Sequence, residues 1–174
     1  MNKLMMLLLP LSLLTGCKSY VWKSSVPADM RTVCVQTFRN ETDVTELGSV
    51  AARQILREIQ REGTFKIAAG QNAAVHVQGV LKKSSLSSMT YRRESYARGR
   101  EYHFEVSAEV SFVDARSGKV LVDNRAYTAE TSFYSGNDIV TARRDASGRL
   151  AEDLARQIVD DLVNFKWNSQ EERK

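Results

Sequence analysis

The chain has 174 residues, of which 26% are charged, and its formal net charge is +4 at pH 7. This length fits one domain with a substantial core, and so small a positive excess does not by itself indicate a nucleic-acid partner. Beyond the first 16 residues, no apolar run approaches the ~20 residues that a membrane-spanning helix needs.

The N-terminus has the pattern of a secretory signal that ends in a lipid anchor. Met1 to Lys3 is short and positive, and Leu4 to Leu14 is almost wholly apolar but too short to span a bilayer. Leu14-Thr15-Gly16-Cys17 then resembles the lipobox of bacterial lipoproteins, which implies cleavage before Cys17 and acylation of that cysteine. The acyl chains would hold the protein to a membrane, and Lys18 in place of aspartate favours the outer membrane. The alternative is an ordinary signal peptide with a chance cysteine.

The next segment predicts a strand, a helix and a second short strand. Residues 31–38 are β-branched and apolar and predict a strand, with Cys34 as a buried structural thiol. Asp43 with Glu46 resembles a capping box at the start of a helix. Apolar residues then recur at helical spacing, and Gly63 suits the left-handed residue that ends a helix. Residues 65–68 are a short strand candidate.

The second half predicts a sheet with one apolar and one polar face. Residues 74–82 and, more clearly, 102–112 alternate between apolar and polar side chains, which is typical of an antiparallel sheet covered on one side. Residues 114–119 are a hairpin connection. Residues 120–133 are the returning strand, whose alternation slips near Asp123-Asn124 and indicates a bulge.

A long helix over residues 138–166 completes the domain. The order of elements predicts an α+β, two-layer sandwich: a mainly antiparallel four- to five-stranded sheet with two helices on one face. We therefore expect a lipoprotein signal peptide over residues 1–16, a lipidated tether over 17–28, a single α+β domain over 29–168 and a polar tail over 169–174.

An ordered series of short motifs covers nearly the whole mature chain. The motifs are Tyr20-Val21-Trp22, Val26-Pro27, the Phe-x-Asn-x-Thr stretch that ends Thr32 to Thr42, Arg57-Glu58, Gly79, Asp114 to Leu121, and Ala151-Glu152-Asp153-Leu154. With the lipobox, this series resembles the LptE family, the lipopolysaccharide-assembly lipoproteins of the outer membrane. The family's basic ligand-contact residues do not align position by position with this chain.

The resemblance implies a binding and assembly role, without catalysis and without a cofactor. Members of the family plug the lumen of a large outer-membrane β-barrel, the LptD-like translocon. They help that barrel to fold and contact lipopolysaccharide. The resemblance therefore implies two partners, the barrel and lipopolysaccharide. It places the chain on the periplasmic side of the outer membrane, held there by its N-terminal lipid, and exported and lipidated as predicted it would not meet nucleic acid.

Lipid A carries phosphates and acyl chains, so arginines beside apolar side chains suit it. Residues 84–100, between the two long strands, have this composition, with Met89, Tyr91 and Tyr96 interleaved among the cations. The candidate lipopolysaccharide-binding residues are Lys82, Lys83, Arg92, Arg93, Arg98 and Arg100. The alternative is an ordinary solvated hairpin. A second basic cluster, Arg143-Arg144 with Arg149, is predicted to be the solvated face of the final helix.

Enzyme and metal sites find little support in the sequence. His103 and Glu105 share a strand face and could hold a metal in principle, but a site needs three or four convergent ligands and none is evident. We therefore expect no catalytic residues and no metal. A second hypothesis is another periplasmic assembly or regulatory lipoprotein, such as a cell-wall synthase activator. Residues 33–42 also resemble the first strand and turn of other envelope α/β modules.

Overall fold

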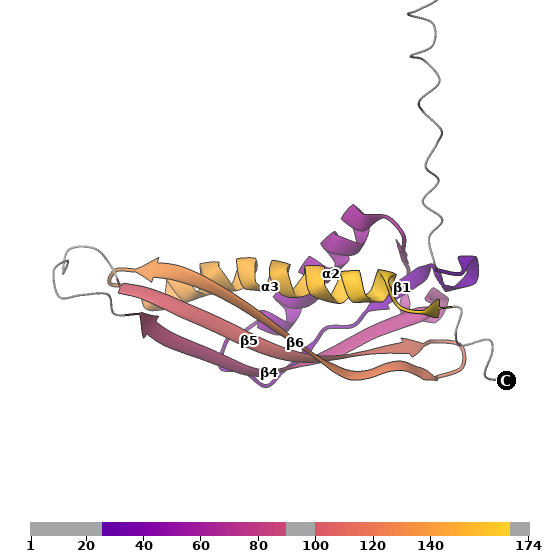
Figure 1. Ribbon diagram of the computed structural model, residues 1–174, viewed down its shortest axis with the longest axis horizontal. Helices are drawn as coiled ribbons and strands as arrows, with labels where there is room; N and C mark the ends of the chain where they lie inside the picture. The colour runs from indigo at the N-terminus through magenta and orange to yellow at the C-terminus, as the bar shows by residue number, and fades with distance from the viewer. Residues whose placement is uncertain (1–25, 90–99, 168–174) are drawn as a thin grey trace, which may run out of the picture.

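The computed structural model describes residues 26–89 and 100–167. The elements are η2 (Ala28–Met30), β1 (Thr32–Val35), β2 (Arg39–Asn40), α2 (Leu47–Glu62), β3 (Lys66–Ile67), η3 (Gly70–Asn72), β4 (Val75–Met89), β5 (Arg100–Asp114), β6 (Val120–Ser135) and α3 (Ile139–Val163). Both helices lie on the same side of the sheet (Figure 1). The predicted signal peptide, Cys17 and the polar tail lie outside the described residues. Neither helix that the structure describes combines the length and hydropathy needed to cross a membrane.

The predicted α+β class and two-layer arrangement are confirmed, but the sheet is mixed and has six strands rather than four or five. The strand order is β3-β1-β4-β5-β6, with β2 also beside β4. β1 runs parallel to β3 and β4, and β2 runs parallel to β4. β4, β5 and β6 follow one another antiparallel. The difference arises from α2, because a helical crossover returns the chain to the same end of the sheet and makes its flanking strands parallel.

The alternating patterns place the core as the sequence predicts. Val75, Val77 and Leu81 of β4 are fully buried, and so are Phe104, Val106, Val110 and Phe112 of β5. The apolar stripes of α2 and α3 cover this face, with Ile55, Ile59, Leu150, Leu154, Ile158 and Leu162 fully or almost fully buried. No helix of the described residues lies over the opposite face of the sheet, which we call the open face (Figure 1).

The Phe-x-Asn-x-Thr stretch joins β1 to α2 by close packing. The ring of Phe38 is 2% exposed and lies against Gly79, where an added Cβ would come within 2.6 Å of it. A Cβ on Gly48 would lie 2.2 Å from the carbonyl oxygen of Phe38. The amide of Asn40 donates to the carbonyl of Val44 (2.7 Å) and accepts from the backbone N–H of Thr42 (3.0 Å). The motif therefore fixes the loop between β2 and α2, and it packs closely against the first turn of α2.

The predicted capping box is wrong. Glu46 precedes the helix with a φ of 64° and makes no side-chain capping bond, and the Asp43 carboxylate faces Arg143 instead. The other end agrees with the prediction: Gly63 has a φ of 84° and donates its backbone N–H to the carbonyl of Ile59. At the start of α2, the long-range ion pair of Asp43 with Arg143 replaces the capping bond that the local sequence predicts. At the end of α2, Gly63 acts as the local sequence predicts.

The predicted bulge in β6 is confirmed, because the register with β5 shifts near Ser111 and Asn124 has a φ of 41°. A second shift separates Leu81 from Lys83 in β4. The prediction of a buried Cys34 is wrong, since the side chain is only partly buried. Val33 takes the core position of β1, so strand alternation turns its neighbour Cys34 to the open face.

Candidate functional site on the sheet arm

The outer halves of the three long strands project beyond β1, β2, β3 and α2 (Figure 1). We define the arm as residues 83–89 of β4, 100–107 of β5 and 128–135 of β6, which are paired with one another throughout. β1 and β2 accompany β4 only as far as Leu81, so the arm has no further strand on this edge among the described residues. α3 covers one face of the arm, and no other described helix or strand lies over the open face (Figure 1).

The base of the arm is held by a polar cluster around Arg143. Its guanidinium donates to both carboxylate oxygens of Asp43 at 2.8 and 2.9 Å and to the hydroxyl of Ser84 at 3.1 Å. The cation also lies 5.0 Å from the centre of the Phe104 ring. The Ser84 hydroxyl in turn donates to Asp43. The hydrogen bonds that Asp43 accepts, from Arg143 first and Ser84 second, hold the pKa of its carboxyl well below its usual range. The cluster therefore ties α3, the turn before α2, β4 and β5 together.

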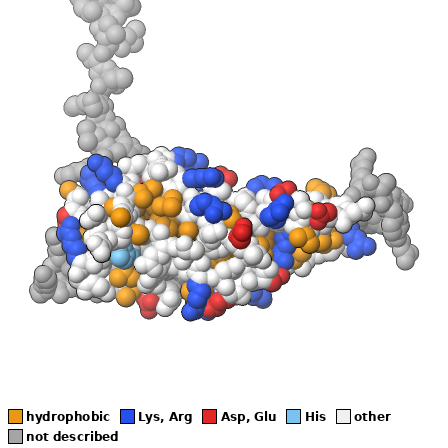
Figure 2. Space-filling model, turned by 180° about the vertical axis from the view of Figure 1, so that it is seen from behind, with side chains coloured by type: hydrophobic (Ala, Val, Ile, Leu, Met, Phe, Trp, Pro, Cys, Tyr) orange, Lys and Arg blue, Asp and Glu red, His pale blue; other side chains and the backbone are white. Residues whose placement is uncertain are grey.

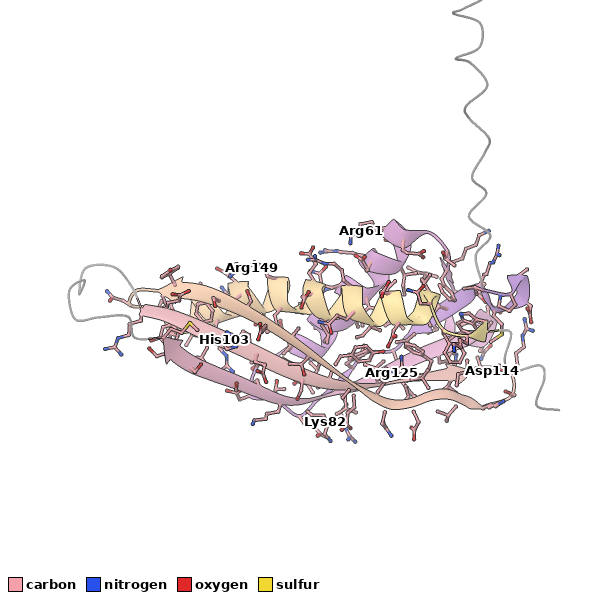
Figure 3. The ribbon with its side chains drawn as sticks, in the orientation of Figure 1. Arg61, Lys82, His103, Asp114, Arg125 and Arg149 are labelled. Carbon is pink, nitrogen blue, oxygen red and sulfur yellow. The ribbon has the colours of Figure 1, made fainter. Side chains whose placement is uncertain are left out.

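The prediction of a solvated arginine face on α3 is wrong for Arg143, whose side chain is only 20% exposed. It holds for Arg144 and Arg149, which are exposed. The helix turns Arg143 toward the sheet one position before Arg144, so neighbouring arginines of one sequence cluster face different environments. Figure 3 shows Arg149 on the α3 side of the sheet.

A second polar cluster fixes the C-terminal half of α3 to β6. The hydroxyl of Tyr127 donates to Asp161 at 2.6 Å, and Arg125 donates to the same carboxylate oxygen at 2.5 Å. Burial first, and then the hydrogen bond to Asp161, raise the pKa of Tyr127 above its usual range. Partial burial opposes ionisation of Asp161, yet its bonds to Tyr127 and Arg125 hold its pKa low. These contacts fit a structural role for the cluster.

The structure separates the predicted lipopolysaccharide-binding residues. Lys82 lies 2.9 Å from Glu41 and 4.0 Å from Glu109, so two carboxylates offset its charge. Lys83 is exposed beside it at the bulge, whereas Arg100 is exposed at the far end of the arm. Lys83 pairs with Ser107, and the seven residues from there to Arg100 span about 23 Å of extended strand. Arg92, Arg93 and Arg98 lie outside the described residues.

Large apolar side chains are exposed at the end of the arm where Arg100 begins β5. Met89 is 43% exposed and Tyr134 is 71% exposed, and both pair with Glu101 from opposite sides. Val140, in the first turn of α3, is 75% exposed. Sequence reasoning identified Met89 but missed Tyr134 and Val140. The signal for Tyr134 was available, because it falls on the polar side of the alternation in β6.

Charges of both signs occupy the arm. Figure 2 shows acidic and basic side chains mixed along the narrow part of the molecule, with hydrophobic side chains between them. The arm is therefore not a uniformly basic surface on this side. A local group of cationic side chains would therefore recognise an anionic ligand here, rather than a positive electrostatic potential spread over the whole surface.

The open face of the arm also brings together His103, Glu105 and Glu130. One ligand atom from each of these side chains lies within 4.8 Å of the other two. The sequence singled out His103 and Glu105 but gave no third ligand. Glu130 comes from the neighbouring strand, where it is the register partner of Glu105, so only the pairing of β5 with β6 reveals it. Figure 3 places His103 farther along the arm than Lys82.

The comparisons with known proteins give the family. The model of the LptE family, described as lipopolysaccharide-assembly, matches residues 30–162. The chain belongs to the LptE family. This match runs from Met30, the last residue of η2, into the last turn of α3, so the LptE domain here includes the arm and both helices. No curated protein matches the sequence significantly.

Solved structures with the same fold support this architecture. A minor lipoprotein from Acinetobacter baumannii has a TM-score of 0.50 at 11% identity, over 77% of this chain and 93% of its own. A hypothetical protein from Chlamydia trachomatis has a TM-score of 0.52 at 14% identity, over 78% and 96% of the two chains. An uncharacterised lipoprotein B from Nitrosomonas europaea has a TM-score of 0.51 at 13% identity, over 86% and 92%. At these identities the likeness shows the fold alone.

Proposed function

We propose that this LptE-family chain is an outer-membrane lipoprotein of lipopolysaccharide assembly, and that it is the plug and folding partner of the translocon β-barrel. The observation that carries the proposal is the family match over residues 30–162, which takes in nearly the whole two-layer domain. The Leu14-Thr15-Gly16-Cys17 sequence supports lipid anchoring at Cys17 on the periplasmic side. The proposed role is binding and assembly, without catalysis.

We propose the tip of the arm as the lipopolysaccharide contact. Arg100 is exposed at this end of β5, where Met89 and Tyr134 are the register partners of its neighbour Glu101, and Val140 is exposed in the first turn of α3. Arginine pairs phosphate oxygens bidentately, and the exposed apolar side chains offer contacts for acyl chains. Arg92, Arg93 and Arg98, which precede β5, are proposed to supply further cations. Lys82 contributes less, because Glu41 and Glu109 already neutralise it.

Co-purification tests the partnership with the barrel. The full chain, with an affinity tag after Lys174, is extracted in mild detergent and the recovered proteins are identified by mass spectrometry. We expect a large outer-membrane β-barrel protein in near-stoichiometric amount. Failure to recover one would contradict the partnership. Depletion of the chain should leave lipopolysaccharide short of the outer leaflet, whereas altered peptidoglycan synthesis would favour a cell-wall synthase activator.

Charge reversal tests the lipopolysaccharide contact. The double variant Arg92→Glu/Arg93→Glu should retain little purified lipopolysaccharide in a pull-down. The matched control, Arg53→Glu/Arg57→Glu, reverses two exposed arginines on α2 and should bind as the wild type does. Equal binding by both double variants would remove the tip from the proposal. Mass spectrometry of the native N-terminus tests the anchor, and an unacylated Cys17 would contradict it.

A further inference from the structure

One imidazole and two carboxylates converge on the open face of the arm. His103 and Glu105 are two residues apart on β5, so their side chains point to the same face, and Glu130 of β6 lies directly across from Glu105. Nε2 of His103 is 3.5 Å from Oε2 of Glu130. Because all three ligand atoms lie within 4.8 Å of one another, a single ion could contact all of them after small side-chain rotations.

The charges at this point favour a cation. Carboxylates that face each other across two strands repel and destabilise the pair. Among the residues that the structure describes, neither Glu105 nor Glu130 forms an ion pair with a lysine or arginine, and the basic side chain within reach of Glu130 is the imidazole of His103. Glu109, on the same face of β5, instead has Lys82 at 4.0 Å. Glu105 and Glu130 therefore have no lysine partner of the kind that Glu109 has in Lys82, and a metal cation would supply the missing positive charge.

The backbone around the three side chains is already ordered. The ladder between β5 and β6 runs without a shift from the Arg100–Ser135 pair to the Val110–Arg125 pair. On the helix-covered face, the rings of Tyr102 and Phe133 stack at 5.6 Å and join the same two strands. The ligands thus stand on neighbouring strands whose spacing is set before any ion binds, which lowers the cost of assembling a site.

From this geometry we propose that His103, Glu105 and Glu130 bind one divalent transition-metal ion, with zinc(II) as the ion of best fit. Calcium and magnesium prefer sets of oxygen ligands, whereas one imidazole nitrogen with two carboxylate oxygens suits zinc and its neighbours. Three protein ligands leave the fourth tetrahedral position to water. The bound ion would cross-link β5 to β6 and neutralise the glutamate pair, a role independent of the proposed function.

The test measures zinc binding by isothermal titration calorimetry on the full chain in detergent, without a polyhistidine tag and after removal of metals by a chelator. Every protein carries Cys34→Ser, because Cys34 and His76 are register partners on the same face and offer a competing pair of ligands. We expect one zinc ion per chain. His103→Gln and Glu130→Gln should each weaken the affinity at least tenfold.

Two matched controls separate this site from general binding to surface groups. Glu109→Gln removes a carboxylate from the same face of the same strand, and His76→Gln removes the other histidine of the chain. Both should keep the affinity within twofold of the parent protein. Zinc should also raise the melting temperature of the parent and of both controls, but not that of the double variant His103→Gln/Glu130→Gln. Circular dichroism of the metal-free proteins confirms that every variant is folded.

In the calorimetry, any of three results would overturn the proposal. These are no saturable zinc binding by the parent protein, equal affinities in the parent and the His103 and Glu130 variants, or a loss of affinity on Glu109→Gln or His76→Gln as large as the loss on His103→Gln. An equal thermal shift in the double variant would overturn it as well. None of these measurements depends on lipopolysaccharide or on the barrel, so failure of the metal site and failure of the proposed function can be distinguished.

Discussion

The body of the domain and its arm are stabilised in different ways. We call the segment from the start of β1 to residue 81 of β4, which includes β2, α2 and β3, the body. There, Phe38 lies between two glycines whose missing side chains make the room for it. The arm instead has one face under α3, a polar cluster at its base and exposed side chains on its open face and tip. Close packing therefore limits which side chains fit in the body. The exposed positions of the arm do not have this constraint and are available for binding.

The largest effect on stability should come from removing a buried side chain in the body. Phe38→Ala leaves a cavity beside Gly79 and should lower the free energy of unfolding by about 3–5 kcal/mol. Urea unfolding of the full chain, followed by circular dichroism, measures the change. A loss of unfolding free energy below about 1 kcal/mol would mean that the surrounding side chains relax into the cavity. It would contradict the close packing assigned to the body.

Adding volume to the body should also destabilise it. Gly79→Ala forces a Cβ within 2.6 Å of the Phe38 ring and should cost about 1–3 kcal/mol. Gly148→Ala is the control, since a Cβ there meets nothing within 4 Å in the middle of α3. It should stabilise the protein by about 0.5–1 kcal/mol, because alanine favours helix more than glycine does. Changes of the same sign in the two variants would contradict the assigned difference in packing.

At the base of the arm, stability should depend on pH through Asp43. Its pKa is lowered in the folded state, so its contribution is present above the unfolded value of 3.8 and is lost as the pH falls through the lower folded value. Asp43→Asn should cost about 1 kcal/mol at pH 7, because the carboxylate is largely exposed and solvent screens the pair. The difference in free energy of unfolding between Asp43→Asn and the wild type should be the same at pH 5 as at pH 7, and smaller at pH 3.

Urea unfolding at the three pH values measures this dependence. Asp145→Asn is the control, because Asp145 is exposed on α3 and forms no ion pair with a described residue. It should change stability little at any of the three. A cost of Asp43→Asn that grows as the pH falls would contradict the ion-pair account.

The smallest effect on stability should come from the tip of the arm. Tyr134→Ser/Val140→Ser should change the free energy of unfolding by less than about 0.5 kcal/mol per site, since both side chains are exposed. The same variant should retain less lipopolysaccharide in the pull-down. Val120→Ser, an exposed valine at the other end of β6, should leave binding unchanged. If the Tyr134→Ser/Val140→Ser variant is stable and binds lipopolysaccharide as the wild type does, these apolar side chains do not contact the ligand.

Local patterns were enough to predict much of the fold. Strand alternation and helical spacing identified the buried faces of β4, β5 and α3, and Gly63 and the slip near Asn124 marked a helix end and a bulge. These features depend on residues a few positions apart, whose geometry the backbone sets directly. The basic and apolar composition near the tip was likewise visible, although Tyr134 and Val140 join that surface from elsewhere in the chain.

Other features were decided only when distant segments met. Asp43 reads locally as a helix cap, yet it binds Arg143, 100 residues farther along the chain. Glu130 joins His103 and Glu105 only through the register of β6 on β5. The parallel pairing of β1 with β4 depends on the crossover through α2. Register, crossover and long-range ion pairs are set by the packing of the whole chain, so the sequence alone determined the faces of the elements and the tertiary structure decided which faces meet.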